Sequence, residues 1–215
     1  LEAAKDVAAE FINGRPNDNI GITLFAGETF TQCPLTVDHA VLLDMIHNIK
    51  CGLITDGTAV GMGIANAVTR LKDSKAKSKV IILLTDGTNN KGDISPMTAA
   101  EIAKSFGIRV YTIGVGTNGM APYPYPVGNT VQYVSMPVEI DEKTLTEIAG
   151  TTDGNYFRAT SNSKLKEVYE EIDKLEKTKL NVKEYSKRDE EYHWFALAAF
   201  LCVLLEVLLR NSVLK

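Results

Sequence analysis

Cysteine, tryptophan and clustered basic residues are all scarce in this sequence of 215 residues. Its three cysteines, Cys33, Cys51 and Cys202, have no C-x-x-C spacing and are too few for a disulfide scaffold or a cysteine metal site, so we expect each to be a small buried apolar residue. The 23 basic and 27 acidic residues give a net charge of −4, and every basic cluster contains interleaved acids. The sequence therefore lacks the positive patch by which proteins bind nucleic acids.

The motifs of common nucleophilic and nucleotide-binding sites are missing as well. The sequence contains neither G-x-S-x-G nor G-x-x-x-x-G-K. The tripeptide Asp86-Gly87-Thr88 would fit the phosphatase motif Asp-x-Asp-Gly-Thr only with an aspartate at the position of Leu84. A G-x-G-x-x-G pattern at 114–119 runs into prolines, which cannot open the helix that a dinucleotide site requires. The three histidines (His39, His47 and His193) are scattered, and we expect surface or capping roles for them.

Only one long apolar run is present, at residues 194–209, where Glu206 is the one polar residue. A helix of that length extends roughly 24 Å, against about 30 Å for the hydrocarbon core of a bilayer. Flanking aromatic residues and a snorkelling Arg210 extend it, so we predict a transmembrane helix over 192–210. A buried core helix and an interfacial helix are the alternatives, although an interfacial helix needs a polar face. The predicted span follows a charged juxtamembrane stalk at 180–191 and precedes a short tail at 211–215.

Strands and helices alternate through residues 1–179. The aliphatic run Val80–Leu84 is typical of a strand buried on both faces of a parallel sheet, and Ser95 and Asp141 are suited to cap helices. The alternation predicts a doubly wound α/β fold with a mostly parallel sheet. The expected helices cover 1–12, 41–49, 60–71, 96–106, 141–150 and 165–175, and the expected strands cover 20–25, 29–36, 79–84, 108–115 and 155–159.

Ligands of doubly wound sheets bind beyond the carboxyl ends of the strands, which directs attention to two loops. Asp86 directly follows the most apolar strand, and its carboxylate is suited to a hard cation or a hydroxyl ligand. Thr58 precedes the helix expected at 60–71, where its hydroxyl can reach a ligand. The alternatives are structural: Asp86 would hydrogen-bond the amides of its own turn, and Thr58 would cap the helix.

Three segments together resemble one family. I-T-D-G-T-A-V-G-M-G-I-A at 54–65, I-I-L-L-T-D-G-T-N at 81–89 and V-Y-T-I-G-V-G at 110–116 are similar, in this order and spacing, to the von Willebrand factor A (VWA) domain, over residues 1–179. The bacterial aerotolerance (Bat) proteins of BatA type are a closer resemblance, carried by the segments at 136–150 and 154–160 and by E-E-Y-H-W before the apolar run.

The resemblance implies a metal-ion-dependent adhesion site (MIDAS), which holds one Mg²⁺ at the carboxyl edge of the sheet. Thr58 and Asp86 match the family's Thr and Asp ligands, but the Asp-x-Ser-x-Ser motif that supplies the others is absent from this sequence. We therefore expect an N-terminally truncated domain that lacks its first, central strand; a degenerate site is the alternative. Such a piece should bind Mg²⁺ poorly and be prone to aggregate.

The resemblance further implies an interaction module and not an enzyme, assembled with sibling Bat proteins and a MoxR-type AAA+ ATPase in envelope or oxidative-stress tolerance. The alternative is an uncharacterised metal-dependent enzyme that uses the same sheet edge. Basic residues are more numerous before the apolar run than after it, which favours a cytoplasmic domain. The family's layout implies a periplasmic domain on the bacterial inner membrane, which we favour.

An insertion at 116–137 is rich in proline and tyrosine and is too long for an ordinary connection. Residues 130–136 could pair as a small ribbon. The insertion is equally compatible with a packed surface loop and with a partner-binding element.

Overall fold

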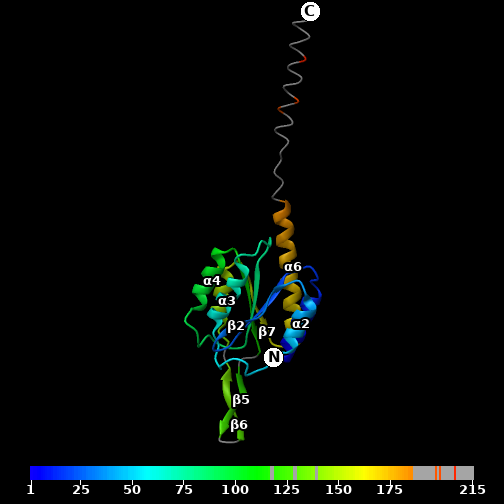
Figure 1. Cartoon of the computed structure of the whole chain (residues 1–215). Coiled ribbons are helices and arrows are strands. Elements are labelled where there is room, and N and C mark those ends of the chain that lie inside the picture. Colours follow the sequence, from blue (N-terminus) through cyan, green and yellow to red (C-terminus); the bar gives the residue numbers. More distant parts are fainter. Residues whose placement is uncertain are drawn as a thin grey trace, which may run out of the picture. The chain divides into compact units, whose positions relative to one another are not determined.

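The computed structural model describes residues 1–116, 119–127, 130–138 and 140–185, together with the single positions 197, 199 and 206. Contacts divide the chain into a unit Leu1–Glu176 and a unit Lys177–Lys215. The elements, labelled where space allows in Figure 1, are α1 (Glu2–Asn13), β1 (Ile20–Phe25), β2 (Thr29–Thr36), α2 (His39–His47), α3 (Val60–Leu71), β3 (Val80–Thr85), α4 (Pro96–Ser105), β4 (Arg109–Val115), β5 (Gly119–Val127), β6 (Thr130–Val138), α5 (Glu142–Thr151), β7 (Tyr156–Ala159) and α6 (Asn162–Tyr185).

A parallel sheet of three strands forms the centre of the first unit. Its order is β3-β4-β7, and β3 pairs with β4 along its whole length, from Val80 opposite Arg109 to Thr85 opposite Gly114. Strand β7 adds to the other edge of β4, with Thr112 opposite Tyr156. Each connection between these strands passes through helices, as the alternation in the sequence predicts. The predicted parallel α/β sheet is thus confirmed.

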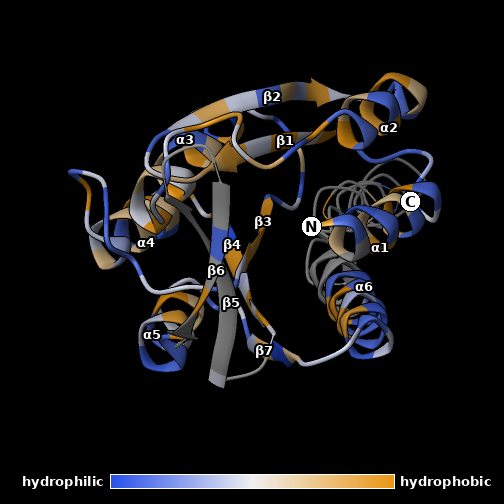
Figure 2. Ribbon diagram, turned by 90° about the horizontal axis from the view of Figure 1, so that it is seen from below, coloured by the Kyte–Doolittle hydropathy of each residue, from blue (hydrophilic) through white to orange (hydrophobic). Residues whose placement is uncertain are grey.

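Helices cover both faces of this sheet. Figure 2 shows α3, α4 and α5 on one side and α1 and α6 on the other. Successive strand residues alternate between the two layers: Ile81 and Leu83 pack with α3 and α4, whereas Ile82 and Tyr111 pack with α1 and α6. The apolar run of β3 is therefore buried from both sides, which explains why it shows no polar alternation.

Strands β1 and β2 form a separate antiparallel hairpin, with Phe25 opposite Thr29. The hairpin packs with α2 around a small core that contains Cys33 and Leu42. In the described part of the chain no strand pairs with the second edge of β1 or with the second edge of β3. The β1–β2 hairpin and the β3-β4-β7 sheet are thus two separate sheets in place of one continuous sheet.

The predicted helix caps are present. The side chain of Ser95 accepts a hydrogen bond from the Thr98 amide, with Pro96 in the first turn of α4, and Asp141 accepts from the Thr144 amide at the start of α5. The prediction of buried cysteines is right for Cys33 and wrong for Cys51, and Cys202 lies outside the described residues. Cys33 is buried, but Cys51 is exposed because it lies in the irregular loop between α2 and α3.

The insertion after β4 forms a two-stranded antiparallel hairpin of its own. Strand β5 pairs with β6 without interruption, from Gly119 opposite Val138 to Val127 opposite Thr130. The predicted ribbon at 130–136 is therefore correct, and its partner is the proline-rich segment 119–127.

The transmembrane helix predicted over 192–210 lies almost wholly outside the described residues, so it stays a prediction. Within the residues that are described, no helix combines the length and the apolar character needed to cross a bilayer.

Candidate functional site

The two candidate ligands lie in loops at the same end of the first unit. Asp86 directly follows β3, at the carboxyl edge of the parallel sheet, and Thr58 lies just before α3. The two loops adjoin, because a Cβ atom placed on Gly87, the residue after Asp86, would be 3.4 Å from Oγ1 of Thr58. Asp86 is exposed and Thr58 is half-buried, so a ligand in solvent can reach both.

Thr58 does not cap α3, contrary to the structural alternative. The N-cap residue of α3 is Ala59, which has no side-chain cap. Among the hydrogen bonds between described residues, Thr58 takes part through its backbone amide and carbonyl groups, and its hydroxyl is not used. The hydroxyl therefore remains available for a ligand.

Asp86 does not stabilise its own turn either. The Gly87 amide donates to Oγ1 of Thr85 at 3.3 Å, so the hydroxyl of Thr85, and not the carboxylate of Asp86, accepts the hydrogen bond in this turn. In the described part of the chain, no hydrogen bond or ion pair is formed by the carboxylate of Asp86. Two oxygen-bearing side chains at this edge are thus uncommitted.

Two asparagines that the sequence reasoning missed join these loops. Oδ1 of Asn90 accepts from the Thr58 amide at 2.9 Å, and Oδ1 of Asn89 accepts from the Val60 amide at 2.9 Å. The Thr58 carbonyl in turn accepts from the amides of Asn90, at 3.0 Å, and Lys91, at 3.3 Å. The loop after β3 therefore caps α3 and fixes the position of Thr58. Asparagine is a strong helix capper, but these two act on a helix about thirty residues earlier, which no local pattern could indicate.

Glycines allow this close packing. Gly57 has φ +141°, and a Cβ there would lie 2.5 Å from Cγ of Lys91. A Cβ on Gly61 would lie 2.1 Å from the backbone oxygen of Ile94, so α3 meets the start of α4 with no room for a side chain. Close packing around Thr58 thus requires a glycine at positions 57 and 61.

The donor chemistry fits a hard divalent cation in part. Hydroxyl and carboxylate oxygens are suitable Mg²⁺ ligands, but a six-coordinate ion needs more than two protein atoms unless water completes its shell. Among the described residues no three His, Cys, Asp or Glu side chains are grouped closely enough to hold a metal ion. Thr58 and Asp86 would thus supply only two protein ligands of such an ion, and other oxygen atoms would have to supply the rest.

A buried polar cluster lies at the opposite, amino ends of the strands. Glu176 of α6 is 5% exposed; its carboxylate accepts from the Tyr111 hydroxyl at 2.6 Å and from Ser78 at 2.8 Å, and it pairs with Arg109. Burial alone would raise the pKa of Glu176, but the hydrogen bonds from Tyr111, Arg109 and Ser78 outweigh it and hold the pKa below its usual value. This cluster joins α6 to the sheet far along the strands from Asp86.

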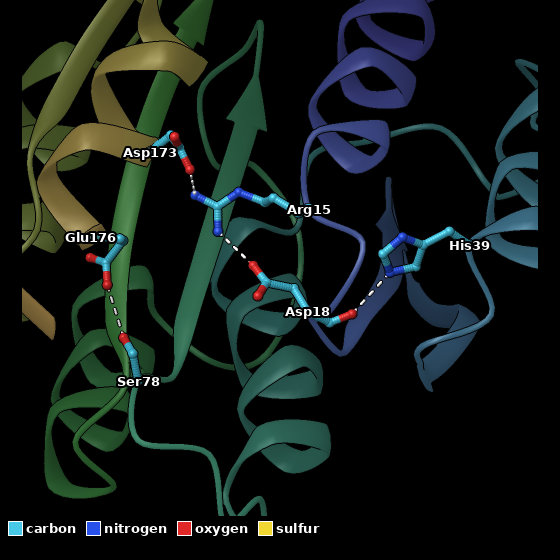
Figure 3. Close-up of polar contacts among 6 residues, drawn as sticks. All are labelled: Arg15, Asp18, His39, Ser78, Asp173 and Glu176. Carbon is cyan, nitrogen blue, oxygen red and sulfur yellow. Dashed lines mark hydrogen bonds and ion pairs between the residues drawn. The ribbon is translucent and has the colours of Figure 1, made fainter.

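A second polar group joins α1 to α6. Figure 3 shows Arg15 between Asp18, at 2.7 Å, and Asp173, at 2.6 Å, and Nε2 of His39 next to the Asp18 backbone oxygen. The guanidinium also lies 4.4 Å from the centre of the Phe11 ring. His39 therefore has the surface structural role that we predicted.

These features define an α/β domain with an exposed oxygen site on loops at the carboxyl edge of its parallel sheet. The chain matches the von Willebrand factor type A domain over residues 1–171, and it belongs to that family. The predicted VWA identity is thus confirmed.

Relatives support the Bat resemblance. A conserved hypothetical protein, BatB, from Bacteroides thetaiotaomicron has a solved structure with 33% identity and a TM-score of 0.70, over 82% of this chain and 88% of that one. An aerotolerance-related membrane protein from Bacteroides fragilis is 29% identical with a TM-score of 0.69, over 80% and 86% of the two chains. An uncharacterized protein from Borreliella burgdorferi is 26% identical over 100% of this chain and 63% of its own length. The chain spans between half and two-thirds of the length of the curated relatives it matches.

One solved relative holds a metal. Proximal thread matrix protein 1 from the mussel byssus, described with a zinc-occupied MIDAS motif, is 25% identical to this chain with a TM-score of 0.61, over 81% of this chain and 40% of that one.

Proposed function

We propose that this chain is a membrane-anchored VWA interaction module that binds protein partners through a Mg²⁺-dependent adhesion site. The observation that carries the proposal is the pair of uncommitted oxygen groups of Thr58 and Asp86 on adjoining loops, where Asn90 and Asn89 hold the backbone at Thr58 and Val60. These supports are hydrogen bonds to the backbone and glycine packing, so the Thr58 segment is positioned before any ligand binds. The metal-bearing mussel relative supports a divalent ion at this edge.

Such a site binds a partner by ligand exchange. Mg²⁺ keeps several water ligands when few carboxylates surround it, so one position is open to an acidic side chain of another protein. With one carboxylate from Asp86 and a neutral hydroxyl from Thr58, the ion would retain positive charge that favours an acidic ligand. This chemistry needs neither a nucleophile nor a general base.

The remaining ligands are expected from a strand that is not in this sequence. The second edges of β1 and β3 are both unpaired in the described part of the chain, and a strand inserted between them would unite the two sheets. Its carboxyl end would then adjoin the loop that carries Asp86. An Asp-x-Ser-x-Ser loop at that point would complete the oxygen shell.

The cellular setting is proposed from the relatives and from the apolar run. The aerotolerance-related membrane protein from Bacteroides fragilis supports a Bat-type setting. For that setting we propose sibling Bat proteins and a MoxR-type AAA+ ATPase as partners. The predicted helix over 192–210 would anchor the domain in the bacterial inner membrane, with the VWA domain in the periplasm.

The test compares two aspartates on one loop in the intact protein. Asp86→Ala should weaken Mg²⁺ binding at least tenfold in titration calorimetry and abolish the capture of partners from solubilised membranes, as EDTA should. Asp93→Ala removes the same charge from an exposed position on the same loop and should change neither. Thr58→Val should resemble Asp86→Ala, because it removes the hydroxyl and keeps the backbone hydrogen bonds.

Unchanged Mg²⁺ affinity in Asp86→Ala would contradict the proposal, and metal-dependent turnover lost in that variant would favour the enzyme alternative.

A further inference from the structure

The β5–β6 hairpin has one edge closed to further strand pairing and one edge open. Antiparallel pairs alternate between positions that exchange backbone hydrogen bonds with the partner strand and positions whose N–H and C=O groups point away from it. Proline has no N–H, so in a paired strand it occupies the outward positions. Pro122, Pro124 and Pro126 occupy alternate positions of β5, which assigns the even-numbered residues of β5 to the outward set.

The register then fixes the outward set of β6. Pro122 is opposite Ser135, Pro124 is opposite Tyr133 and Pro126 is opposite Val131. The one proline of β6, Pro137, is opposite Met120 and belongs to the same set, so the assignment is consistent across both strands.

The two outer edges therefore differ. On β5, three of the four outward positions (120, 122, 124 and 126) are prolines, so this edge offers carbonyl groups but almost no donors. On β6, the consecutive outward positions Val131, Tyr133 and Ser135 each offer both N–H and C=O. In the described part of the chain no third strand pairs with this hairpin. The open edge of β6 is the feature that a binding partner would use.

We propose that the open edge of β6 pairs with β6 of a second copy of this chain. Antiparallel pairing about a two-fold axis at Tyr133 places Val131 opposite Ser135 of the second copy and Tyr133 opposite its own equivalent. Each copy then donates three backbone hydrogen bonds and accepts three. The pairing does not extend further along the strands, because the next pair would join Pro137 to position 129, which is beyond the end of β6.

Charge and topology both favour a second copy as the occupant. Strands β5 and β6 contain no charged residue, so two identical edges can pair without placing like charges opposite each other. The product is a four-stranded sheet in the order β5-β6-β6-β5, whose two outer edges are both closed by prolines. The assembly therefore stops at a symmetric dimer and does not extend into a fibre. A lone two-stranded hairpin is marginally stable in water, and two further strands would stabilise it.

Disulfide trapping in the intact protein, extracted in mild detergent, tests this pairing. In a background with Cys51→Ser and Cys202→Ser, Tyr133→Cys should form a linked dimer on mild oxidation. The two residues would be a hydrogen-bonded pair with Cα atoms about 5.5 Å apart, which a disulfide can span. Met120→Cys, on the closed edge of β5, is the matched control and should not link. Equal linking of the two variants, or linking of Tyr133→Cys to a different protein in place of its own copy, would overturn the proposal.

Proline substitutions give a second readout that does not depend on oxidation. Ser135→Pro removes one outward N–H group from β6. The same strand already contains a proline, Pro137, at an outward position, so the hairpin should keep its fold. It should raise the dimer dissociation constant at least tenfold in sedimentation experiments, whereas Met120→Pro should leave it unchanged. Replacing Pro122, Pro124 and Pro126 together by alanine should open the other edge and produce oligomers larger than a dimer. A protein that stays monomeric at all concentrations, or a dimer that Ser135→Pro does not weaken, would refute the pairing.

Discussion

Loss of the Glu176 charge should destabilise the domain far more than loss of an exposed charge on the same helix. The side chains of Glu176 and Arg109 are only 6% and 15% exposed, and the carboxylate also accepts from Tyr111 and Ser78. Breaking a buried ion pair by removing one partner costs about 3–5 kcal/mol, because the other charge stays buried. We expect Glu176→Gln, which keeps the size of the side chain, to lower the free energy of unfolding by about 3 kcal/mol.

The matched control is Glu167→Gln. Glu167 also lies on α6 and pairs with Lys164 at 2.6 Å, but both side chains are more than half exposed. Solvent screens such a pair, so its loss should change the free energy of unfolding by less than about 0.5 kcal/mol. Urea unfolding of both variants and the wild type gives the comparison. Equal effects of the two substitutions would refute the assigned role of the buried cluster.

The pH dependence provides an independent check with a defined sign. Because the pKa of Glu176 is lower in the folded chain than in the unfolded chain, its contribution to stability is complete above the unfolded value of 4.5 and is lost as the pH falls through the folded value. The wild type should therefore lose more stability on acidification below the unfolded value than Glu176→Gln does, and the difference in stability between them should narrow. A difference that widens in acid would contradict the sign.

Three further results are expected. Asn89→Ala should lower the free energy of unfolding by about 1 kcal/mol, because the Val60 amide loses its cap, and the change is measurable by thermal unfolding with Asn17→Ala as an exposed control. Gly61→Ala should cost about 1–3 kcal/mol, because its Cβ would collide with the Ile94 backbone, whereas Gly150→Ala, which meets no atom within 4 Å, should not destabilise the helix it lies in. Ile148→Ala should cost about 2–5 kcal/mol in urea unfolding, because Ile148 is fully buried in the core between the sheet and its helices; a cost below about 1 kcal/mol would contradict that packing.

The sequence predicts most of the fold because the order of its elements is encoded locally. The aliphatic run of β3, the caps Ser95 and Asp141 and the helical stripe of α6 each depend on residues a few positions apart. Alternation of strands with helices then leaves few topologies. The prediction that Cys51 is buried was wrong because burial is not encoded locally. In an irregular loop it is set by distant parts of the chain and not by the residue type.

The site could be predicted only as two separate residues. The sequence indicated Thr58 and Asp86, but not that Asn89 and Asn90 would bind the Thr58 segment, nor that Thr85 would stabilise the turn in place of Asp86. The buried Glu176 cluster was missed entirely, since it joins residues up to 98 positions apart. In the sequence, a glutamate on the exposed face of an amphipathic helix looks the same as a buried glutamate with hydrogen-bond partners. Only knowledge of those partners distinguishes the two.

The contacts of Asn89 and Asn90 also constrain the order in which the site can form during folding. The backbone around Thr58 is held partly by the turn between β1 and β2, where the Ala26 carbonyl accepts from the Ala59 amide at 2.7 Å, and partly by side chains from a loop about thirty residues later. Its restraints are therefore complete only once β3 and the loop after it are in place. Contacts across such a separation form late, after the chain has lost the entropy of closing the intervening segment. Metal affinity at this edge would therefore report that β3 and the loop after it have reached their native positions.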